Sequence, residues 1–162
     1  MSTTKTLYIG IDPSPTATGI TGLDYIGKHL RSVVVSEIYV GPELDNISTY
    51  FLYAKYDRII FVIEKGANKR NFAPVVTLAR EIERNIKRIF GRSVTVVFVA
   101  PSTWRKDMYG RGFGNIGTDA AKAKAINYCK TVLGVEYTDH NEAESRILAE
   151  WAQSKDRGRE LQ

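Results

Sequence analysis

The segment IIFVIE, residues 59–64, places five apolar residues in succession before a glutamate. A strand of this kind suits the centre of a sheet that is covered on both faces. The segment SVTVVFV, residues 93–99, is similarly apolar and predicts a second buried strand. Two such strands favour an α/β protein, in which helices pack against both sides of the sheet.

The remaining sequence patterns predict the order of the other elements. Alternating and β-branched residues predict strands over residues 7–12, 17–23 and 31–40, with a break at the following Gly-Pro pair. Apolar residues at helical spacing predict helices over residues 44–56, 72–90, 118–133 and 141–152. Residues 101–117 are rich in glycine, aromatic residues and positive charge, and they predict a loop. A three-strand meander followed by alternating strands and helices indicates a mixed sheet flanked by helices.

The size and cysteine content limit the class of protein. The 162 residues fit one domain, which we expect over residues 1–155, followed by a frayed tail over residues 156–162. A single cysteine, Cys129, excludes an internal disulfide framework and favours a cytoplasmic or nuclear compartment. One cysteine and two histidines also provide too few ligands for a usual zinc site. The segment MSTTKTLYIG has no long apolar stretch, so we expect neither a signal peptide nor a membrane span.

The chain is moderately basic, with a formal net charge of +5 and a pI of about 9.3. Its positive residues gather in three segments, 65–70, 84–92 and 103–114. Each segment alone is also typical of a solvated surface. Together they are compatible with a polyanionic partner such as a nucleic acid.

Two of the predicted strands end on an acid. Asp12 ends the first strand in IGIDPSPTATGI, and Glu64 ends the buried strand in FVIEKG. If these strands are neighbours, the two carboxylates lie side by side at the sheet edge where open α/β sheets bind ligands. Their mutual repulsion is relieved by a cation, and hard oxygen ligands suit magnesium.

A third acid is available from the last predicted helix, in the segment DHNEAESRILAEWA. The residues three, four and seven positions after Glu144 are Ile, Leu and Trp, so Glu144 shares the apolar face of the helix. The same steps from Glu142 reach Ser, Arg and Ala, which form a more polar face. Helical phase therefore favours Glu144 as the third acid. Asp139 precedes the helix and can cap it.

These motifs together resemble those of the RuvC-type Holliday-junction resolvases, which belong to the RNase H-like superfamily. IGIDPSPTATGI, FVIEKG and NEAES correspond in order to the acidic motifs of that family. PSTWRK, followed by a glycine-rich loop and a lysine-bearing helix, resembles the bacteriophage branch in particular. The resemblance covers nearly the whole chain. It implies an RNase H-like mixed five-stranded sheet, with a three-strand antiparallel meander plus two parallel strands, flanked by helices.

The resemblance assigns metal-binding roles position by position. Asp12 matches the first acid, Glu64 the second, and Glu144 the final acid, where the family usually has aspartate. Asn141 occupies the position three residues earlier, where the family has Asp or His, and it supplies only a neutral oxygen. The fourth ligand remains open, because a shifted helix start would present His140. Alignment on Asp139 and Glu142 would instead restore a two-acid spacing.

The resemblance also implies a mechanism and an assembly. Two Mg²⁺ ions, about 3.5–4 Å apart and bridged by Asp12, would hydrolyse a phosphodiester and leave 5′-phosphate and 3′-hydroxyl ends. Mn²⁺ is expected to substitute. Lys122 is expected either to assist at the scissile phosphate or to be an exposed helix lysine. A four-way DNA junction has two-fold symmetry, so the resemblance implies a homodimer in the cytoplasm, or in the host cytoplasm for a phage protein. The helix over residues 72–90 is either an interface or core-facing.

We expect phosphate contacts from basic residues near the acids, with an aromatic residue that stacks or wedges at the junction. The residues expected to bind DNA are Lys65, Lys69, Arg70, Phe72, Arg105, Lys106 and Arg111. Tyr109 and Phe113 are further aromatic candidates, whereas Trp104 is expected in the core.

Three other functions share parts of this pattern. A nuclease of the same fold could cut flaps or other branched DNA with the same metals. A DNA-binding module without catalysis would also be basic, and the neutral Asn141 and the Asp-to-Glu replacement at position 144 slightly favour it. An ATPase of the sugar-kinase or actin type begins with a similar strand and aspartate, but that fold needs two such domains.

Overall fold

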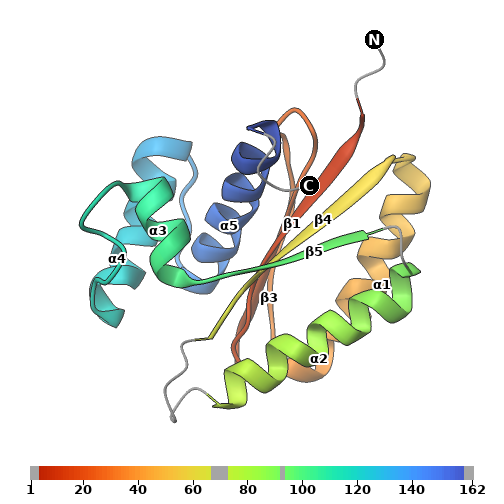
Figure 1. Cartoon of the computed structure of the whole chain (residues 1–162), viewed down its shortest axis with the longest axis horizontal. Coiled ribbons are helices and arrows are strands. Elements are labelled where there is room, and N and C mark those ends of the chain that lie inside the picture. The colour runs from red at the N-terminus through yellow and green to blue at the C-terminus, as the bar shows by residue number, and fades with distance from the viewer. Residues whose placement is uncertain (1–3, 67–72, 92–93, 159–162) are drawn as a thin grey trace.

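The computed structural model describes residues 4–66, 73–91 and 94–158. Within them, five strands form one sheet in the order β3-β2-β1-β4-β5 (Figure 1). The strands are β1 Thr6–Asp12, β2 Thr18–Leu23, β3 His29–Val35, β4 Arg58–Glu64 and β5 Val94–Val99. The helices are α1 Glu37–Ala54, α2 Ala73–Phe90, α3 Pro101–Tyr109, α4 Thr118–Tyr128 and α5 His140–Arg157, with a π-helical segment Cys129–Leu133 after α4.

The strand directions confirm the predicted mixed sheet. β2 pairs antiparallel with β1 and with β3, whereas β4 pairs parallel with β1 and with β5. The sheet is therefore an antiparallel meander extended by two parallel strands, as in the RNase H-like fold.

The helices cover the two faces of the sheet in two groups. α3, α4 and α5 lie on one side, and α1 and α2 lie on the other (Figure 1). Because side chains alternate along a strand, β4 contributes to both cores. Ile60 and Val62 pack on the α5 side, while Ile59, Phe61 and Ile63 pack on the α1 and α2 side.

The helix α5 packs closely on the sheet because the strands beneath it carry glycines. A Cβ atom on Gly19 would lie 2.1 Å from the carbonyl oxygen of Asn141. No side chain fits in that space, so glycine permits a close approach that brings the first turns of α5 against β2. The cap of this helix agrees with the sequence, since the Asp139 carboxylate accepts a 2.7 Å hydrogen bond from the backbone nitrogen of Asn141.

The predicted third strand is wrong beyond residue 35. β3 ends at Val35, and α1 begins at Glu37 and continues through the Gly-Pro pair that was expected to break the chain. Val40 and Leu44 are four residues apart and both buried. Helical geometry places both side chains against the sheet, and this contact outweighs the local preference of the β-branched residues and of the Gly-Pro pair.

The predicted loop over residues 101–117 is wrong in its first half. Residues 101–109 form α3, which has proline at its start, where the missing N–H is tolerated. Trp104 is fully buried and anchors this helix in the core, as expected for that residue. Residues 110–117 do connect α3 to α4 as a loop, with Gly110 and Gly112 at φ values of 99° and 95°.

The last helix extends past the expected domain boundary at residue 155. α5 continues to Arg157, and the Asp156 carboxylate accepts a 2.8 Å hydrogen bond from the Tyr8 hydroxyl. Arg58 forms an ion pair of 3.0 Å with the same carboxylate. Asp156 is therefore held against the sheet by side-chain contacts.

The helix α2 packs one face against the core, and its role in an interface stays a prediction. Leu78, Ile82 and Ile86 are buried against the sheet and α1. The outward side of α2 carries ion pairs such as Lys87–Glu83 at 2.7 Å. None of the helices in the described segments combines the length and apolar character needed to cross a membrane.

Candidate active site

Two carboxylates meet at the carboxyl ends of the neighbouring strands β1 and β4. Ile11 pairs with Ile63 in parallel register, and Asp12 and Glu64 follow them directly. Alternation places Glu64 on the same face as Val62, which packs on the α5 side. Asp12 likewise falls two residues after Gly10, on which α5 rests. The sequence therefore positions both acids under one helix.

A closed turn fixes the chain directly after Asp12. The Thr18 hydroxyl donates a 2.7 Å hydrogen bond to the Ser14 carbonyl oxygen and accepts one of 3.2 Å from the Ser14 nitrogen. Pro13, which joins Asp12 to Ser14, is buried. These contacts close the turn between β1 and β2 and hold Asp12 at its base.

The third acid comes from α5. Glu144 is only 6% exposed and lies close enough to Asp12 for the two side chains to share a hydrogen bond. Burial, followed by repulsion from Glu64 and Glu144, raises the pKa of the Asp12 carboxyl well above its ordinary value. Burial and repulsion from Glu144 likewise raise the pKa of Glu64 to about 7. The three acids thus form one electrostatically coupled cluster.

Two residues of α3 contact this cluster. The Trp104 indole nitrogen donates a 2.7 Å hydrogen bond to Oε2 of Glu64. Nη2 of Arg105 lies 3.2 Å from Oε1 of Glu144 and forms an ion pair with it. The positive charge of Arg105 and the hydrogen bond from Trp104 both lower the pKa of Glu64 and partly oppose its rise.

The cluster opens into a cavity of about 620 Å³ between the sheet end, α3, α4 and α5. Its lining includes every residue predicted to be catalytic, namely Asp12, Glu64, Glu144, Asn141 and Lys122. Asp139, His140 and Glu142 are not among the described residues that line it. The geometry therefore favours Asn141 and Glu144 over the two alternative registers.

Sequence comparison gives no match, since no protein-family model and no curated protein matches the chain. Comparison with solved structures does give matches. Thermus thermophilus RuvC in complex with a Holliday junction substrate aligns with a TM-score of 0.69 at 15% identity, over 97% of this chain and 98% of that chain. A second structure of Thermus thermophilus RuvC aligns with a TM-score of 0.63 at 16% identity, over 94% and 96% of the two chains.

The protein has the fold of RuvC. The RNase H-like architecture expected from the motifs is thereby confirmed along nearly the whole chain. The resemblance to the bacteriophage branch stays a prediction.

The donor chemistry of this site fits a hard divalent cation. Three carboxylates and the Asn141 amide line the cavity. Burial and then mutual repulsion raise the pKa values of Asp12 and Glu64, and a bound cation would offset both effects. The arrangement is not preassembled, because no group of three or more His, Cys, Asp or Glu within residues 4–66, 73–91 and 94–158 is spaced to hold a metal ion. Glu64 and Glu144 are instead engaged by Trp104 and Arg105.

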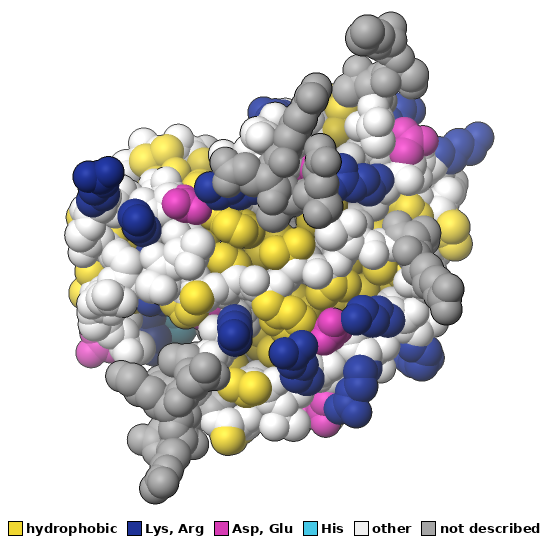
Figure 2. Space-filling view, viewed as in Figure 1, with side chains coloured by type: hydrophobic (Ala, Val, Ile, Leu, Met, Phe, Trp, Pro, Cys, Tyr) yellow, Lys and Arg dark blue, Asp and Glu magenta, His cyan; other side chains and the backbone are white. Residues whose placement is uncertain are grey.

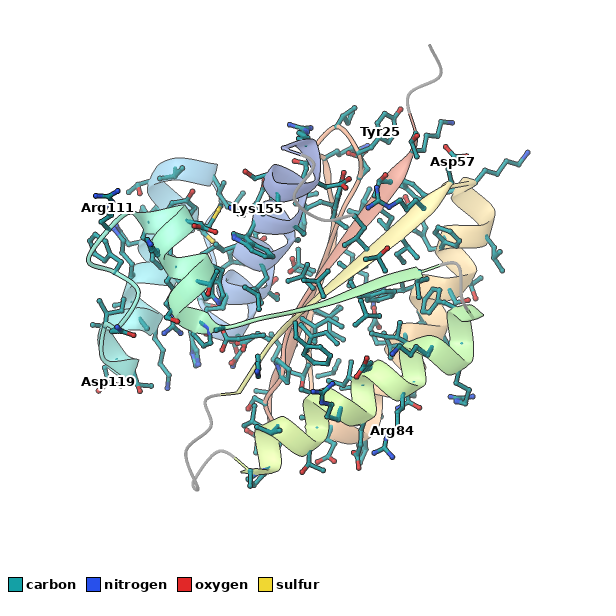
Figure 3. The ribbon with its side chains drawn as sticks, in the orientation of Figure 1. Tyr25, Asp57, Arg84, Arg111, Asp119 and Lys155 are labelled. Atoms are coloured by element: carbon teal, nitrogen blue, oxygen red, sulfur yellow. The ribbon has the colours of Figure 1, made fainter. Side chains whose placement is uncertain are left out.

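The residues predicted to bind DNA occupy three different places. Lys65 and Arg105 line the cavity, whereas Lys106 and Arg111 line an adjoining groove of about 440 Å³ that shares Ser102 with it. Arg111 lies at the outer edge of the α3–α4 side, away from Arg84 on α2 (Figure 3). Lys69, Arg70 and Phe72 lie outside the described residues. Figure 2 shows further Lys and Arg side chains gathered along α2.

The two other aromatic candidates belong to a packed cluster. Tyr109 contacts Trp104 edge-on, with ring centroids 5.5 Å apart, and Phe113 contacts Tyr109 in the same manner at 6.3 Å. The Lys124 ammonium lies 4.6 Å from the Phe113 ring centroid. These contacts hold the glycine-rich loop against α4, so neither ring is free to insert between bases without leaving the cluster.

The sequence did not reveal the contacts of Trp104 and Arg105. Trp104 was expected in the core and Arg105 on a phosphate, yet both touch the acidic cluster. Their adjacency in PSTWRK, after a strand parallel to the Glu64 strand, is the signal that could have placed them at this sheet edge.

Proposed function

We propose that the protein is a divalent-metal-dependent endonuclease that resolves four-way DNA junctions by paired phosphodiester hydrolysis. The observation that carries this proposal is the convergence of Asp12, Glu64 and Glu144 from β1, β4 and α5 at one cavity. Carboxylates that raise each other's pKa are poorly suited to a purely structural role, since they destabilise the fold unless a cation neutralises them. The fold supports the same conclusion, because a RuvC of this fold has been seen with a Holliday junction substrate.

The residues of the cavity would have different roles in metal binding, positioning and phosphate binding. Asp12, Glu64 and Glu144 would hold one or two Mg²⁺ ions, with Asn141 as a neutral ligand, and Mn²⁺ would serve in their place. Bound cations would supply Lewis acidity toward a phosphodiester and a water nucleophile, giving 5′-phosphate and 3′-hydroxyl ends. Trp104 orients the Glu64 carboxylate through its hydrogen bond. Lys122, which also lines the cavity, would bind the scissile phosphate.

DNA would be held mainly through its phosphates. Lys65 in the cavity and Lys106 and Arg111 in the adjoining groove would contact successive phosphates. Lys69, Arg70 and Phe72 are proposed to extend this surface, with Phe72 stacking at an opened junction base.

Two symmetric cuts in a two-fold symmetric junction require two active sites, so we propose that the protein acts as a homodimer. The apolar face of α2 is already buried in the core, so any contribution of α2 to the interface would come from its outward, charged side. Size-exclusion chromatography with light scattering gives the mass directly, and a monomer on junction DNA would contradict paired cleavage by one complex.

The decisive experiment is cleavage of synthetic four-way junctions with Mg²⁺, compared with flaps, forks and linear duplexes. We expect symmetric nicks in the four-way junction from the wild type. Asp12→Asn, Glu64→Gln and Glu144→Gln should bind the junction without cutting it. Glu136→Gln is a suitable control, because Glu136 is exposed and its ion pair is a surface contact of 2.8 Å with Lys130.

Each alternative function predicts a different result. Preferential cleavage of flaps or forks would identify a branched-DNA nuclease with the same chemistry. Junction binding with no cleavage under Mg²⁺ or Mn²⁺ would identify a non-catalytic DNA-binding module. Unchanged cleavage by Glu144→Gln would show that the third acid is assigned incorrectly.

A further inference from the structure

Arg105 lies in an unusual position for a residue expected to contact DNA. Its side chain is 15% exposed and points into the carboxylate cavity, where Nη2 lies 3.2 Å from Oε1 of Glu144. The guanidinium also lies 5.2 Å from the Trp104 ring centroid. Its Nε is buried and has no hydrogen-bond partner within the described residues. An arginine with an unsatisfied buried donor is held by charge rather than by a complete set of hydrogen bonds.

The negative charges of the cavity explain why the Arg105 guanidinium is held there. Three carboxylates share a poorly solvated space, and Arg105 lowers the pKa of both Asp12 and Glu64 against the effects of burial and repulsion. Arg105 therefore performs part of the neutralisation that a divalent cation would perform. A guanidinium and a divalent cation held by the same carboxylate would repel each other strongly in such an enclosed site.

We propose that Arg105 is the built-in counter-ion of the metal-free site and competes with divalent cations for Glu144. This inference rests on the proposed function. Metal binding displaces the guanidinium from Glu144 into the open part of the cavity, which Arg105 already lines together with Lys122. There the planar guanidinium fork matches a DNA phosphate, so the residue exchanges a carboxylate partner for a phosphate partner.

The Arg105–Glu144 ion pair stabilises the metal-free protein and lowers its apparent affinity for the metal. Without a cation, Arg105 limits the repulsion among the acids. With a cation, the energy of the ion pair is lost, so the apparent metal affinity is lower than the carboxylates alone would give. DNA that captures the released guanidinium favours the metal-bound state, and by linkage the metal favours DNA binding to the same extent.

Calorimetric titration of DNA-free protein with Mn²⁺ tests the competition. Arg105→Met keeps the length and the packing on Trp104 but removes the charge. We expect its Mn²⁺ affinity to rise about tenfold or more relative to the wild type. Its melting temperature without metal should fall and should recover when Mn²⁺ is added. Arg88→Met is the matched control, since Arg88 is exposed on α2 and its loss changes the net charge equally.

A second readout follows the arginine itself. In protein labelled with ¹⁵N-arginine, the Arg105 Hε proton should exchange slowly with water in the metal-free state and faster at saturating Mg²⁺, because Nε becomes accessible. An Arg105 Hε signal that does not respond to Mg²⁺ would overturn the proposal. So would a folded Arg105→Met variant whose Mn²⁺ affinity is unchanged or weaker. Should this variant fail to fold, Arg105→Gln provides the same comparison.

The outcomes also separate this inference from the proposed function. If the wild type binds Mn²⁺ and cuts junctions while Arg105→Met binds Mn²⁺ no more tightly, only the competition is wrong. If neither protein binds Mn²⁺ and the wild type does not cut, the nuclease assignment fails and the inference fails with it.

Discussion

Gly10 lies directly beneath the backbone of Ser145, so closely that a Cβ atom on Gly10 would sit 2.1 Å from the Ser145 carbonyl oxygen. The same Cβ would lie 2.6 Å from the backbone nitrogen of Ala149. Neither neighbour is a side chain that can turn aside. The position of α5, and with it the position of Glu144 relative to Asp12, depends on the absence of a side chain at residue 10.

Gly10→Ala is expected to destabilise the protein by roughly 1–3 kcal/mol, because α5 must move away from β1. Junction cleavage should fall further than stability alone explains, since the movement separates Glu144 from Asp12. Urea denaturation and single-turnover cleavage measure the two effects. Gly41→Ala is the control, because a Cβ there meets nothing within 4 Å. Equal behaviour of the two variants would contradict this account of α5.

Trp104→Phe is expected to shift the pH dependence of cleavage to higher pH. The indole hydrogen bond lowers the pKa of Glu64, so its loss leaves this carboxyl protonated over a wider pH range. Hydrogen bonds to charged groups contribute enough that cleavage near neutral pH should fall about tenfold. Trp151→Phe provides the control, since it loses a comparable 2.8 Å hydrogen bond to Asp107. If both variants show the wild-type profile, the Trp104 bond has no role in tuning Glu64.

The metal-free protein is expected to lose stability as the pH rises through about 7. Burial and repulsion raise the pKa of Glu64 to about 7 in the folded state, and the pKa of Asp12 is also raised. When the pKa of a carboxyl is higher in the folded than in the unfolded state, the folded state binds the proton more tightly. The resulting stabilisation is complete at a pH below the unfolded pKa, and it is lost as the pH rises through the folded pKa. We expect a loss on the order of 2 kcal/mol between pH 5 and 8.

Thermal denaturation from pH 5 to 8 in the presence of a chelator measures this effect. Mg²⁺ should restore stability at pH 8, where the carboxylates are charged, and should have little effect at pH 5. Glu64→Gln should flatten the pH dependence. A wild-type stability that rises steadily from pH 5 to 8 without metal would contradict the raised pKa values.

Loss of the groove cations should weaken junction binding in a salt-dependent way. Lys106→Ala and Arg111→Ala are each expected to lower affinity and to reduce the slope of log affinity against log salt concentration by about one. Filter-binding or anisotropy titrations over a range of salt concentrations, in Ca²⁺ to prevent cleavage, provide both values. Arg88→Ala, on the exposed side of α2, should leave the slope unchanged. A slope unaffected by both groove variants would exclude this groove from the DNA path.

The central sheet and the acidic cluster were predictable because they depend on periodicity. The uniformly apolar strand before Glu64 indicated a buried position, and helical phase selected Glu144 over Glu142. Both inferences use local spacing, and the structure brings Asp12, Glu64 and Glu144 to one cavity.

The secondary-structure predictions were wrong where tertiary contacts outweigh the local preference of the residues. The segment EIYVGP has β-branched residues and a Gly-Pro pair, yet it is helical because Val40 and Leu44 contact the sheet together. The partner of Arg105 was unpredictable for a different reason. The sequence has several cations near positions 103–114, and nothing in their spacing indicates which one points inward.

The contacts of Asp156 have a consequence for the opposite end of α5. This residue is bonded to Tyr8 and Arg58 near the amino-terminal ends of β1 and β4, and it lies twelve residues, or about 18 Å along the helix, from Glu144. The carboxyl-terminal end of α5, which is remote from the acidic cluster, is thus held to the sheet by these contacts. A truncation that removes residue 156 would leave every acid in place in the sequence, yet it would allow the helix to pivot and carry Glu144 out of alignment.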